Sequence, residues 1–273
     1  MQDASKPIWF KQIDDPKKVK IMVATPVHSE VSIHYTQALL VFQGQCLLRN
    51  IQVDFLLLKS SLVTQGRNIC VSNFLNGDYT HLLFIDSDIE FKPDSIFKML
   101  ELNKEVISMP YPMKTINWDS MHKRLNQIKD SNQLSKLGLM YPIKVENQNE
   151  VTSVGGVIEV TASPTGCMLI KREAIDKMIK AYPELRIDQP TVLNGEPTTV
   201  KNMYNFFDTY FDPIEHKYHG EDFAFCMKWR KIGGKCYCYV MDEITHVGEH
   251  CYTGRFWDEL YNTRKIDDLD KIK

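Results

Sequence analysis

Apolar positions in the first third of the chain alternate between two spacings. Short runs rich in β-branched and aromatic residues, typical of buried strands, precede stretches in which apolar residues recur every three to four positions, as in a helix. The strand-like runs are Val19–Ala24, Ile51–Leu58, His81–Ile85 and Glu105–Met109, and the helical stretches are Ile33–Leu48, about Gly66–Leu75 and a helix opening at Pro93. The proline of Thr25-Pro26 is expected to end the first strand.

The pattern weakens in the middle of the chain and then returns. Asn117–Asn149 is polar apart from a helical pattern over Trp118–Ile128, and we expect a mobile flap there. Further strands are predicted at Val151–Thr161, Pro164–Ile170 and Lys235–Val240, helices at Glu173–Ala181 and Glu221–Lys231, and a surface loop at Asp188–Pro197.

Alternating strands and helices predict an α/β fold with a central, mostly parallel, Rossmann-like sheet flanked by helices. Ligands of such sheets bind at the carboxyl ends of the strands. With 273 residues the chain can bury one large core, so we expect a single domain over 1–273.

Composition narrows the classes of function. The 33 basic residues (Lys and Arg) nearly balance the 35 acidic ones, which gives no electrostatic argument for a nucleic-acid partner. The seven cysteines are irregularly spaced, unlike a disulfide framework, and indicate a reducing compartment. Met1–Pro16 lacks the apolar core of a signal peptide, and no segment approaches the roughly 18 apolar residues of a membrane span. We therefore expect a cytoplasmic protein with no membrane span.

The main candidate site is Asp86-Ser87-Asp88, which follows the apolar run His81–Ile85 directly. Two carboxylates at a rigid strand end suit a hard divalent cation, and a diphosphate is the natural third partner. A solvated turn is the alternative for any Asp-x-Asp, but the buried strand before this one favours a metal site at the sheet edge.

Two later segments carry further candidate groups. Gly220-Glu221-Asp222 opens a helix, where its carboxylates either cap the helix or place a general base within reach of an acceptor hydroxyl. His246 follows the last predicted strand and is either an ordinary strand-end histidine or a nitrogen ligand among the oxygens of a Mn²⁺ site.

Two segments could hold an anion. Gln65-Gly66-Arg67-Asn68 is predicted to open a helix. It either binds a phosphate or the aspartate pair, or it is simply the start of a surface helix. Met109–Lys114 is restricted by two prolines. It either lines a sugar-phosphate site, to which Lys114 adds a positive charge, or is a rigid connection.

The order of these features resembles the GT-A class of nucleotide-sugar glycosyltransferases, and more narrowly the small soluble members of chloroviruses and other large algal DNA viruses. The matching elements span most of the chain and are Ala24-Thr25-Pro26, Gln65-Gly66-Arg67-Asn68, Asp86-Ser87-Asp88, Pro164-Thr165-Gly166-Cys167-Met168, Gly220-Glu221-Asp222 and His246. For a viral member, the compartment implied is the host cytoplasm.

The resemblance implies a nucleotide-sugar-binding half at about 19–115 and an acceptor-binding and catalytic half at about 150–250. It implies that a UDP-sugar is the donor and a glycan the acceptor, and that the metal is Mn²⁺ or Mg²⁺, held by Asp86, Asp88 and His246. The donor-binding residues would be Thr25, Pro26, Arg67, Asn68, Asp86, Ser87 and Lys114.

In inverting members of this class the aspartate of the Glu-Asp pair is the base, which implies that Asp222 deprotonates the acceptor hydroxyl. A late metal-binding histidine such as His246 also occurs in retaining members, so a retaining enzyme with the same donor site is the alternative. The transferred sugar is expected to be a pentose such as xylose, or a common hexose.

Two other classes compete with this reading. A haloacid-dehalogenase-like phosphatase also carries Asp-x-Asp after a buried strand, but Glu90 stands where that class usually has Thr or Val. A glycan- or nucleotide-binding module without turnover is the non-enzymatic alternative, and the presence of all four of Asp86, Asp88, Asp222 and His246 argues against it.

Overall fold

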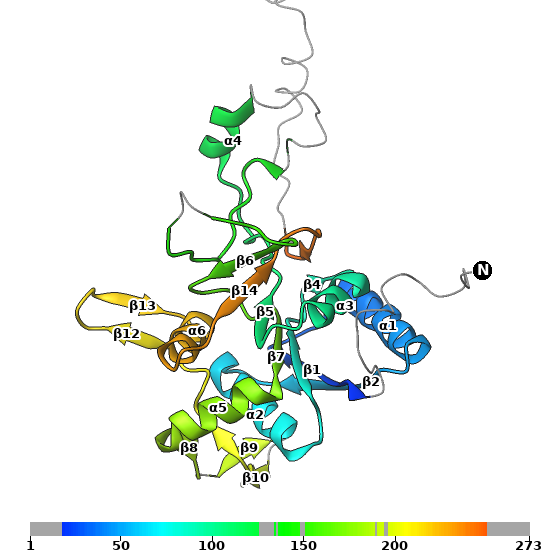
Figure 1. The fold of residues 1–273 in the computed structure, drawn as a ribbon, viewed down its shortest axis with the longest axis vertical. Helices are drawn as coiled ribbons and strands as arrows, with labels where there is room; N and C mark the ends of the chain where they lie inside the picture. The colour runs from blue at the N-terminus through cyan, green and yellow to red at the C-terminus, as the bar shows by residue number, and fades with distance from the viewer. Residues whose placement is uncertain are drawn as a thin grey trace, which may run out of the picture.

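The computed structural model describes residues 18–125, 134, 136–147, 151–188, 190–193 and 196–249. Its centre is a seven-stranded sheet (Figure 1). In spatial order the strands are β2 (Gln52–Lys59), β1 (Lys20–Val27), β3 (His81–Ile85), β7 (Cys167–Lys171), β5 (Val106–Ser108), β14 (Cys236–Tyr239) and β6 (Val157–Val160). Strands from both halves of the sequence therefore share one sheet.

The predicted α/β class is confirmed, and the sheet is mixed and partly parallel. Parallel pairs join β1 to β2, β1 to β3 and β5 to β14, whereas β7 runs antiparallel to both β3 and β5, and β6 runs antiparallel to β14. The alternating pattern predicted a mostly parallel sheet. Strands β1, β2 and β3 are parallel neighbours as expected, but the antiparallel β7 lies between β3 and β5. This arrangement is consistent with a GT-A-like fold.

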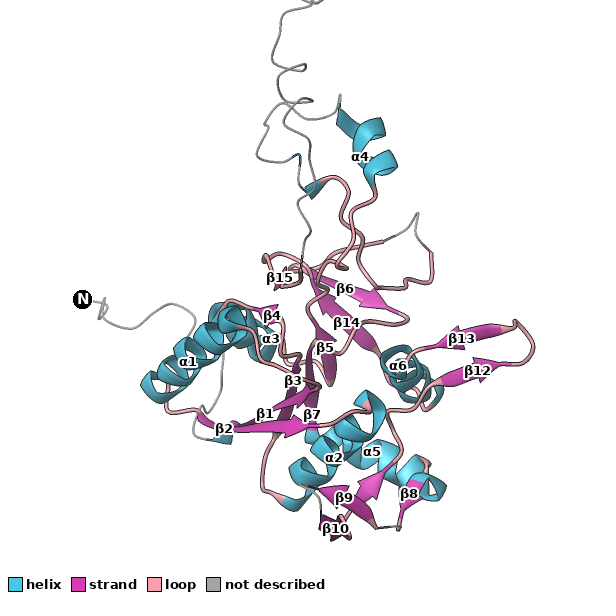
Figure 2. Ribbon diagram, turned by 180° about the vertical axis from the view of Figure 1, so that it is seen from behind, coloured by secondary structure: helices cyan, strands magenta, loops and turns pink. Residues whose placement is uncertain are grey.

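Helices cover both faces of the sheet (Figure 2). Successive side chains of a strand point to opposite faces, so Ile21 and Val23 pack into one core and Met22 and Ala24 into the other. The first core lies under α1 (Ile33–Leu48) and α3 (Pro93–Glu101), and the second lies under α2 (Val63–Asn76), α5 (Arg172–Ala181) and α6 (Glu221–Lys231). Helix α1 has the bounds that its spacing predicted.

Two predicted boundaries that bear on the site are wrong, and the strands predicted from Val151 and Pro164 begin later, at Val157 and Cys167. Strand β1 continues through Pro26 to Val27, because its neighbour β3 pairs only as far as Ala24 and the missing N–H of Pro26 costs no ladder hydrogen bond on that side. Helix α2 begins at Val63 and not at Gly66, so Arg67 and Asn68 lie in its second turn and have no place at an anion-binding helix start.

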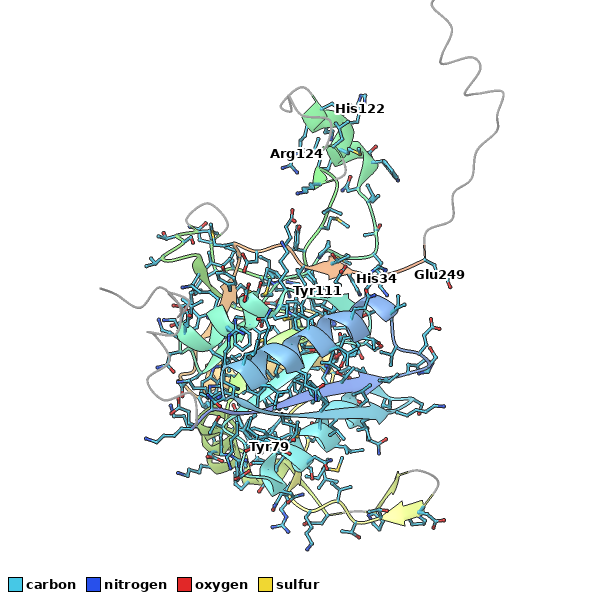
Figure 3. The ribbon with its side chains drawn as sticks, turned by 90° about the vertical axis from the view of Figure 1, so that its right-hand side faces the viewer. His34, Tyr79, Tyr111, His122, Arg124 and Glu249 are labelled. Atoms are coloured by element: carbon cyan, nitrogen blue, oxygen red, sulfur yellow. The ribbon has the colours of Figure 1, made fainter. Side chains whose placement is uncertain are left out.

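Smaller elements lie outside the central sheet. Helix α4 (Trp118–Arg124) projects away from the sheet, as the labels of His122 and Arg124 in Figure 3 show. The predicted helix was longer, and its remainder at 126–128 lies outside the described residues. The predicted loop at 188–197 contains a hairpin instead. The remaining short elements are a 3₁₀ helix (Pro183–Leu185) and β8 (Arg186–Ile187), β9 (Thr191–Leu193), β10 (Glu196–Thr198), β11 (Met203–Tyr204), β12 (Tyr210–Asp212) and β13 (Lys217–His219).

One further pair of short strands matters for the site. Strand β4 (Ile89–Glu90) pairs antiparallel with β15 (Thr245–His246), which places His246 opposite Ile89. No helix in the described ranges has the length and apolarity that crossing a bilayer requires. The six cysteines of these ranges are free and buried, and Cys236 and Cys238 lie on β14 as their spacing predicted.

Candidate functional site

The Asp86-Ser87-Asp88 segment is held at the end of β3 by backbone hydrogen bonds. The N–H of Asp86 donates to the carbonyl of Gly166 (3.0 Å), and the N–H of Val247 donates to the carbonyl of Asp88 (2.8 Å). Strand β3 thus carries the two aspartates to the sheet edge, and the β4–β15 pair brings the chain around His246 against the second one. Backbone hydrogen bonds thus hold together two segments that lie far apart in the sequence.

Asp88 faces two nitrogen-bearing side chains. Its Oδ2 lies 2.5 Å from Lys114 Nζ and 3.4 Å from His246 Nε2. Partial burial alone would raise the pKa of Asp88, but His246 and Lys114 lower it to about 2. The stem of Lys114 lies over Gly248, where a Cβ atom would be 2.7 Å from Lys114 Cδ. Asp88 is therefore ionised at neutral pH and ready to accept a cation.

The imidazole of His246 is oriented by a backbone carbonyl. Its Nδ1 lies 2.9 Å from the carbonyl oxygen of Pro112, which accepts a hydrogen bond when Nδ1 carries the proton. A protonated Nε2 donates to Asp88, which is the hydrogen bond that lowers the pKa of that carboxyl group, whereas the tautomer with the proton on Nδ1 instead offers the Nε2 lone pair to a metal ion. Metal-ligating histidines commonly use their second nitrogen in this way, so Asp88 and His246 fit as an oxygen and a nitrogen ligand of one divalent cation.

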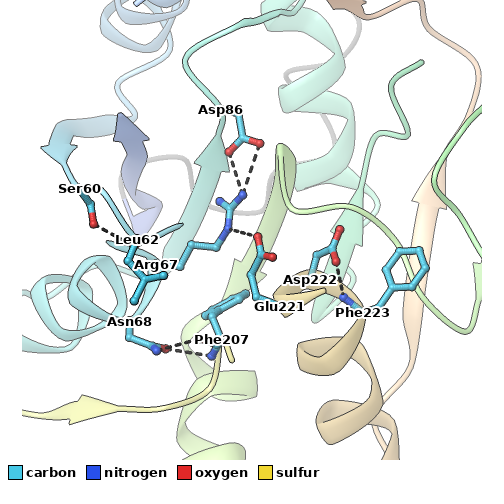
Figure 4. A network of polar contacts seen from close by, with 9 residues as sticks. All are labelled: Ser60, Leu62, Arg67, Asn68, Asp86, Phe207, Glu221, Asp222 and Phe223. Carbon is cyan, nitrogen blue, oxygen red and sulfur yellow. Dashed lines mark hydrogen bonds and ion pairs between the residues drawn. The ribbon is translucent and has the colours of Figure 1, made fainter. Parts of the chain in front are cut away.

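Asp86 is partly exposed, and its carboxylate pairs with a buried arginine. Arg67 Nη2 donates to its Oδ1 (3.0 Å), and Arg67 Nε donates to Glu221 Oε1 (3.2 Å), so one guanidinium joins α2, the end of β3 and the start of α6 (Figure 4). Burial alone would lower the pKa of Arg67, but the two carboxylates raise it above its ordinary value. Arg67 Nη1 is buried and has no hydrogen-bond partner among the described residues.

Asp222 lies in the first turn of α6, beside this ion-paired group. Its Oδ1 accepts a hydrogen bond from the N–H of Phe223 (2.7 Å). Burial and the charge of Glu221 raise the pKa of Asp222 to about 6, while the Phe223 hydrogen bond and Arg67 act in the opposite direction. A carboxyl group with a pKa near 6 is suited to accept a proton at neutral pH.

Two of the predicted donor-binding side chains are held inside the protein. Thr25 is fully buried and shares a 2.6 Å hydrogen bond with Tyr35. Asn68 is buried on α2, where its Nδ2 donates to the carbonyl of Phe207 (2.9 Å) and its Oδ1 accepts from the Phe207 N–H (2.9 Å). These side chains position neighbouring segments in this structure.

The other two predicted donor-binding residues remain partly accessible. Pro26 is half-buried at the end of β1, close to Gly66 of α2. Ser87 is also half-buried, and its carbonyl accepts a hydrogen bond from Ser32, the residue that caps α1 (2.9 Å).

The structure brings the three predicted metal ligands to one corner without grouping them. Among the residues it describes, no set of three or more His, Cys, Asp or Glu side chains is arranged to hold a metal ion. Asp88 and His246 approach each other, whereas Asp86 pairs with Arg67. A cavity of about 770 Å³ adjoins this corner and is lined by His246, Pro110 and Pro112 among others.

Sequence reasoning missed two site residues. Glu221 was predicted as part of a segment that either caps a helix or supplies a base, and its ion pair with Arg67 was not foreseen. Tyr111 packs edge-on against the His246 ring, with centroids 4.9 Å apart and an interplanar angle of 70°. The signal for Tyr111 was its place between Pro110 and Pro112, since two prolines hold the intervening backbone in a narrow range of conformations.

Comparison with known proteins finds distant structural likenesses. The chain is similar to A197 from STIV, at 16% identity over 87% of this chain and 98% of A197, with a TM-score of 0.42. It is similar to a glycosyltransferase involved in the glycosylation of the major capsid of PBCV-1, at 10% identity over 60% and 66% of the two chains (TM-score 0.28). A third similar structure is 4-diphosphocytidyl-2C-methyl-D-erythritol synthase from Anaerococcus prevotii DSM 20548, at 9% identity over 62% and 79% (TM-score 0.32).

No protein-family model and no curated protein matches the chain. At these identities and TM-scores the three structures assign neither a family nor an activity to it.

Proposed function

We propose that this protein is a metal-dependent glycosyltransferase that moves a sugar from a UDP-sugar to a hydroxyl group of a glycan acceptor. The observation that carries the proposal is the approach of His246 Nε2 to Asp88 at 3.4 Å, at the same sheet edge as Asp222 with its pKa of about 6. A cation site for a diphosphate and a proton acceptor are the two groups that such a transfer needs.

The donor side of the site is assigned from charge. Asp88 and His246 would hold Mn²⁺ or Mg²⁺, which when bound neutralises the charge that develops on the departing diphosphate. Lys114, whose ammonium group already lies at this corner, would add a positive charge beside the same phosphates. Arg67, which pairs with Asp86 and Glu221, would hold these two carboxylates beside the donor.

The acceptor side depends on Asp222. Its carboxylate would take the proton of the acceptor hydroxyl while the acceptor oxygen bonds to the anomeric carbon and the bond from that carbon to the diphosphate breaks. The proton ends on Asp222, the electron pair of the broken bond leaves with UDP, and the configuration at the anomeric carbon is inverted. We expect the transfer rate to rise with pH and to reach half of its maximum near pH 6.

The first experiment is a thermal-shift screen of UDP and UDP-sugars, each with and without Mn²⁺. A ligand that binds the native state raises the melting temperature, so the proposal expects a shift that needs both the nucleotide and the metal. The absence of any such shift across the panel would contradict the proposed donor.

The second experiment separates binding from chemistry. Asp222→Asn should keep metal-dependent UDP binding and lower transfer by at least 10²-fold, because it removes the proton acceptor and little volume. Asp94→Asn is the matched control, since Asp94 also lies in the first turn of a helix and pairs with a basic residue, Arg49, away from the site. NMR of the product then distinguishes inversion from the alternative retaining reaction, which would exclude Asp222 as the base.

A further inference from the structure

Tyr111 is placed tightly between the two ends of the candidate site. Its ring lies edge-on to His246, at a centroid distance of 4.9 Å. On its other side the ring and hydroxyl lie against Gly166, where an added Cβ atom would be 2.6 Å from both Tyr111 Cε1 and Oη. Only glycine leaves enough room for this contact.

The hydroxyl of Tyr111 lies against Gly166, a residue that is hydrogen-bonded to the strand end carrying the aspartates. The carbonyl of Gly166 accepts the hydrogen bond of the Asp86 N–H (3.0 Å), so the residue beneath Tyr111 is itself fixed to the end of β3. Pro110 and Pro112 restrict the backbone on either side of the tyrosine. The position of the hydroxyl is therefore set by its own segment and by the neighbouring strand.

The charges around Tyr111 show which groups lie near it. Burial, followed by the carboxylates of Asp86 and Asp222, raises its pKa far above the ordinary value, while Arg67 and a hydrogen bond from the Gly166 backbone act in the opposite direction. Tyr111 therefore lies within electrostatic range of Asp86 at the strand end and of Asp222 on α6. Its hydroxyl, like that of any tyrosine at neutral pH, carries a proton that it can donate.

We propose that Tyr111 forms the floor of the sugar subsite and donates a hydrogen bond from its hydroxyl to the sugar ring of the bound nucleotide sugar. This inference rests on the proposed function. In that function the sugar must lie between the diphosphate at Asp88 and His246 and the base at Asp222. Tyr111 contacts His246 at one end of this interval and lies within electrostatic range of Asp222 at the other. The ligand class is the glycosyl group of a nucleoside diphosphate sugar.

The test compares two affinities in each variant. Isothermal titration with Mn²⁺ present gives the Kd of UDP and of UDP-glucose, UDP-galactose, UDP-xylose and UDP-N-acetylglucosamine. For the sugar that the native protein prefers, Tyr111→Phe should raise the ratio of the UDP-sugar Kd to the UDP Kd about 5- to 10-fold, the usual effect of one lost hydrogen bond. The Kd of UDP itself should change less than 2-fold, because UDP has no sugar to contact the hydroxyl.

Gly166→Ala is a second way to displace the same hydroxyl without changing Tyr111, because the added Cβ would push the tyrosine ring away. It should raise the same ratio at least as much as Tyr111→Phe. Tyr182→Phe is the matched control, because it removes another partly buried tyrosine hydroxyl, the one that donates to the carbonyl of Lys228 (2.8 Å), and should leave the ratio unchanged. If Gly166→Ala does not fold, Tyr111→Phe alone decides.

The outcomes separate the two proposals. If the native protein binds neither UDP nor any UDP-sugar with Mn²⁺, the proposed function fails. If it binds them and Tyr111→Phe leaves the ratio unchanged, or weakens UDP and UDP-sugars equally, the proposed function stands and the sugar-subsite role of Tyr111 is overturned.

Discussion

Asp86 and Asp88 are separated by one residue, yet they occupy different environments. Asp86 turns toward Arg67, whose side chain is only 4% exposed and which also binds Glu221. Asp88 turns toward the surface, where its side chain is 34% exposed and faces Lys114 and His246. The two aspartate side chains are themselves similarly exposed, at 28% for Asp86, and the difference lies in their partners, because Arg67 is buried whereas Lys114 is 41% exposed.

This difference assigns the two aspartates different tasks. A buried ion pair depends on all of its members, because removing one leaves an uncompensated charge in a low dielectric. A partly exposed pair contributes little to folding and its members can change partners. We infer that Asp86 belongs to the framework joining β3, α2 and α6, and that Asp88 belongs to the binding site.

The largest expected effect comes from breaking the buried group. Arg67→Leu leaves the carboxylates of Asp86 and Glu221 without their common partner and should lower the free energy of unfolding by about 3–5 kcal/mol. Urea unfolding followed by circular dichroism measures it. Arg186→Leu is the control, because Arg186 pairs with Asp188 on the surface, and it should cost less than about 0.5 kcal/mol. Equal losses in the two variants would contradict the distinction.

A second, smaller effect concerns Asp88. Asp88→Asn removes the charge of the proposed metal ligand and should abolish the stabilisation by Mn²⁺ with UDP, which is about 2–3 kcal/mol at a ligand concentration of 100 Kd. Its unfolding without ligand should stay within about 1 kcal/mol of the native protein.

Asp78→Asn is the matched control for that variant, since Asp78 also pairs with a lysine, Lys20, at an exposed position. It should leave the ligand-dependent shift intact. A full Mn²⁺–UDP shift in Asp88→Asn would remove Asp88 from the metal site.

The sequence predicted the elements whose signals are local. Helix α1 has a long apolar repeat and was placed with correct bounds, and the apolar run of β3 correctly located the aspartates at a strand end. The start of α2 was misplaced because its N-cap residue is Leu62, whose side chain cannot form a capping hydrogen bond and so gives no sequence signal. The more conspicuous Gln65-Gly66 lies inside the helix. That error placed Arg67 at an exposed helix start when it is in fact buried.

The convergence of the site could not be read from local patterns. Asp88 meets His246 through β4 and β15, which are two residues each and therefore too short to show any periodicity. Tyr111 reaches His246 and Gly166 from a segment without regular secondary structure. Such contacts depend on long-range packing, so the sequence supplied the candidates and the structure supplied their distances.

The pH dependence of stability should have opposite signs for the base and the proposed metal ligand. The pKa of Asp222 is raised from 3.8 to about 6, so between these values the native state holds a proton that the unfolded chain has lost, and the free energy of unfolding falls as the pH rises. Because Asp222 is partly exposed, we expect a change of about 1–2 kcal/mol between pH 4 and pH 6. Unfolding of Asp222→Asn should lack this slope.

For Asp88 the sign is reversed. Its pKa is lowered from 3.8 to about 2, so its ion pairs stabilise the native state fully above pH 3.8 and are lost as the pH falls toward 2. In Asp88→Asn the free energy of unfolding should therefore fall less than in the native protein as the pH drops from about 4 to 2. Its dependence on pH between pH 4 and pH 6 should be unchanged. A single variant that removed both slopes would show that the two carboxyl groups titrate together and would contradict their separation.

The smallest expected effect concerns Lys114, which belongs to the exposed side of the comparison. Lys114→Met keeps the aliphatic stem that lies over Gly248 and removes only the ammonium group. Because the pair with Asp88 is partly exposed, the free energy of unfolding should change by less than about 0.5 kcal/mol. With Mn²⁺ present the Kd of UDP should rise about 3- to 10-fold, since one positive charge beside the diphosphate is lost. Lys20→Met, which breaks the surface pair with Asp78, should leave the Kd unchanged. An unchanged Kd in Lys114→Met would show that Lys114 pairs with Asp88 but does not contact the diphosphate, and would contradict its proposed role in donor binding.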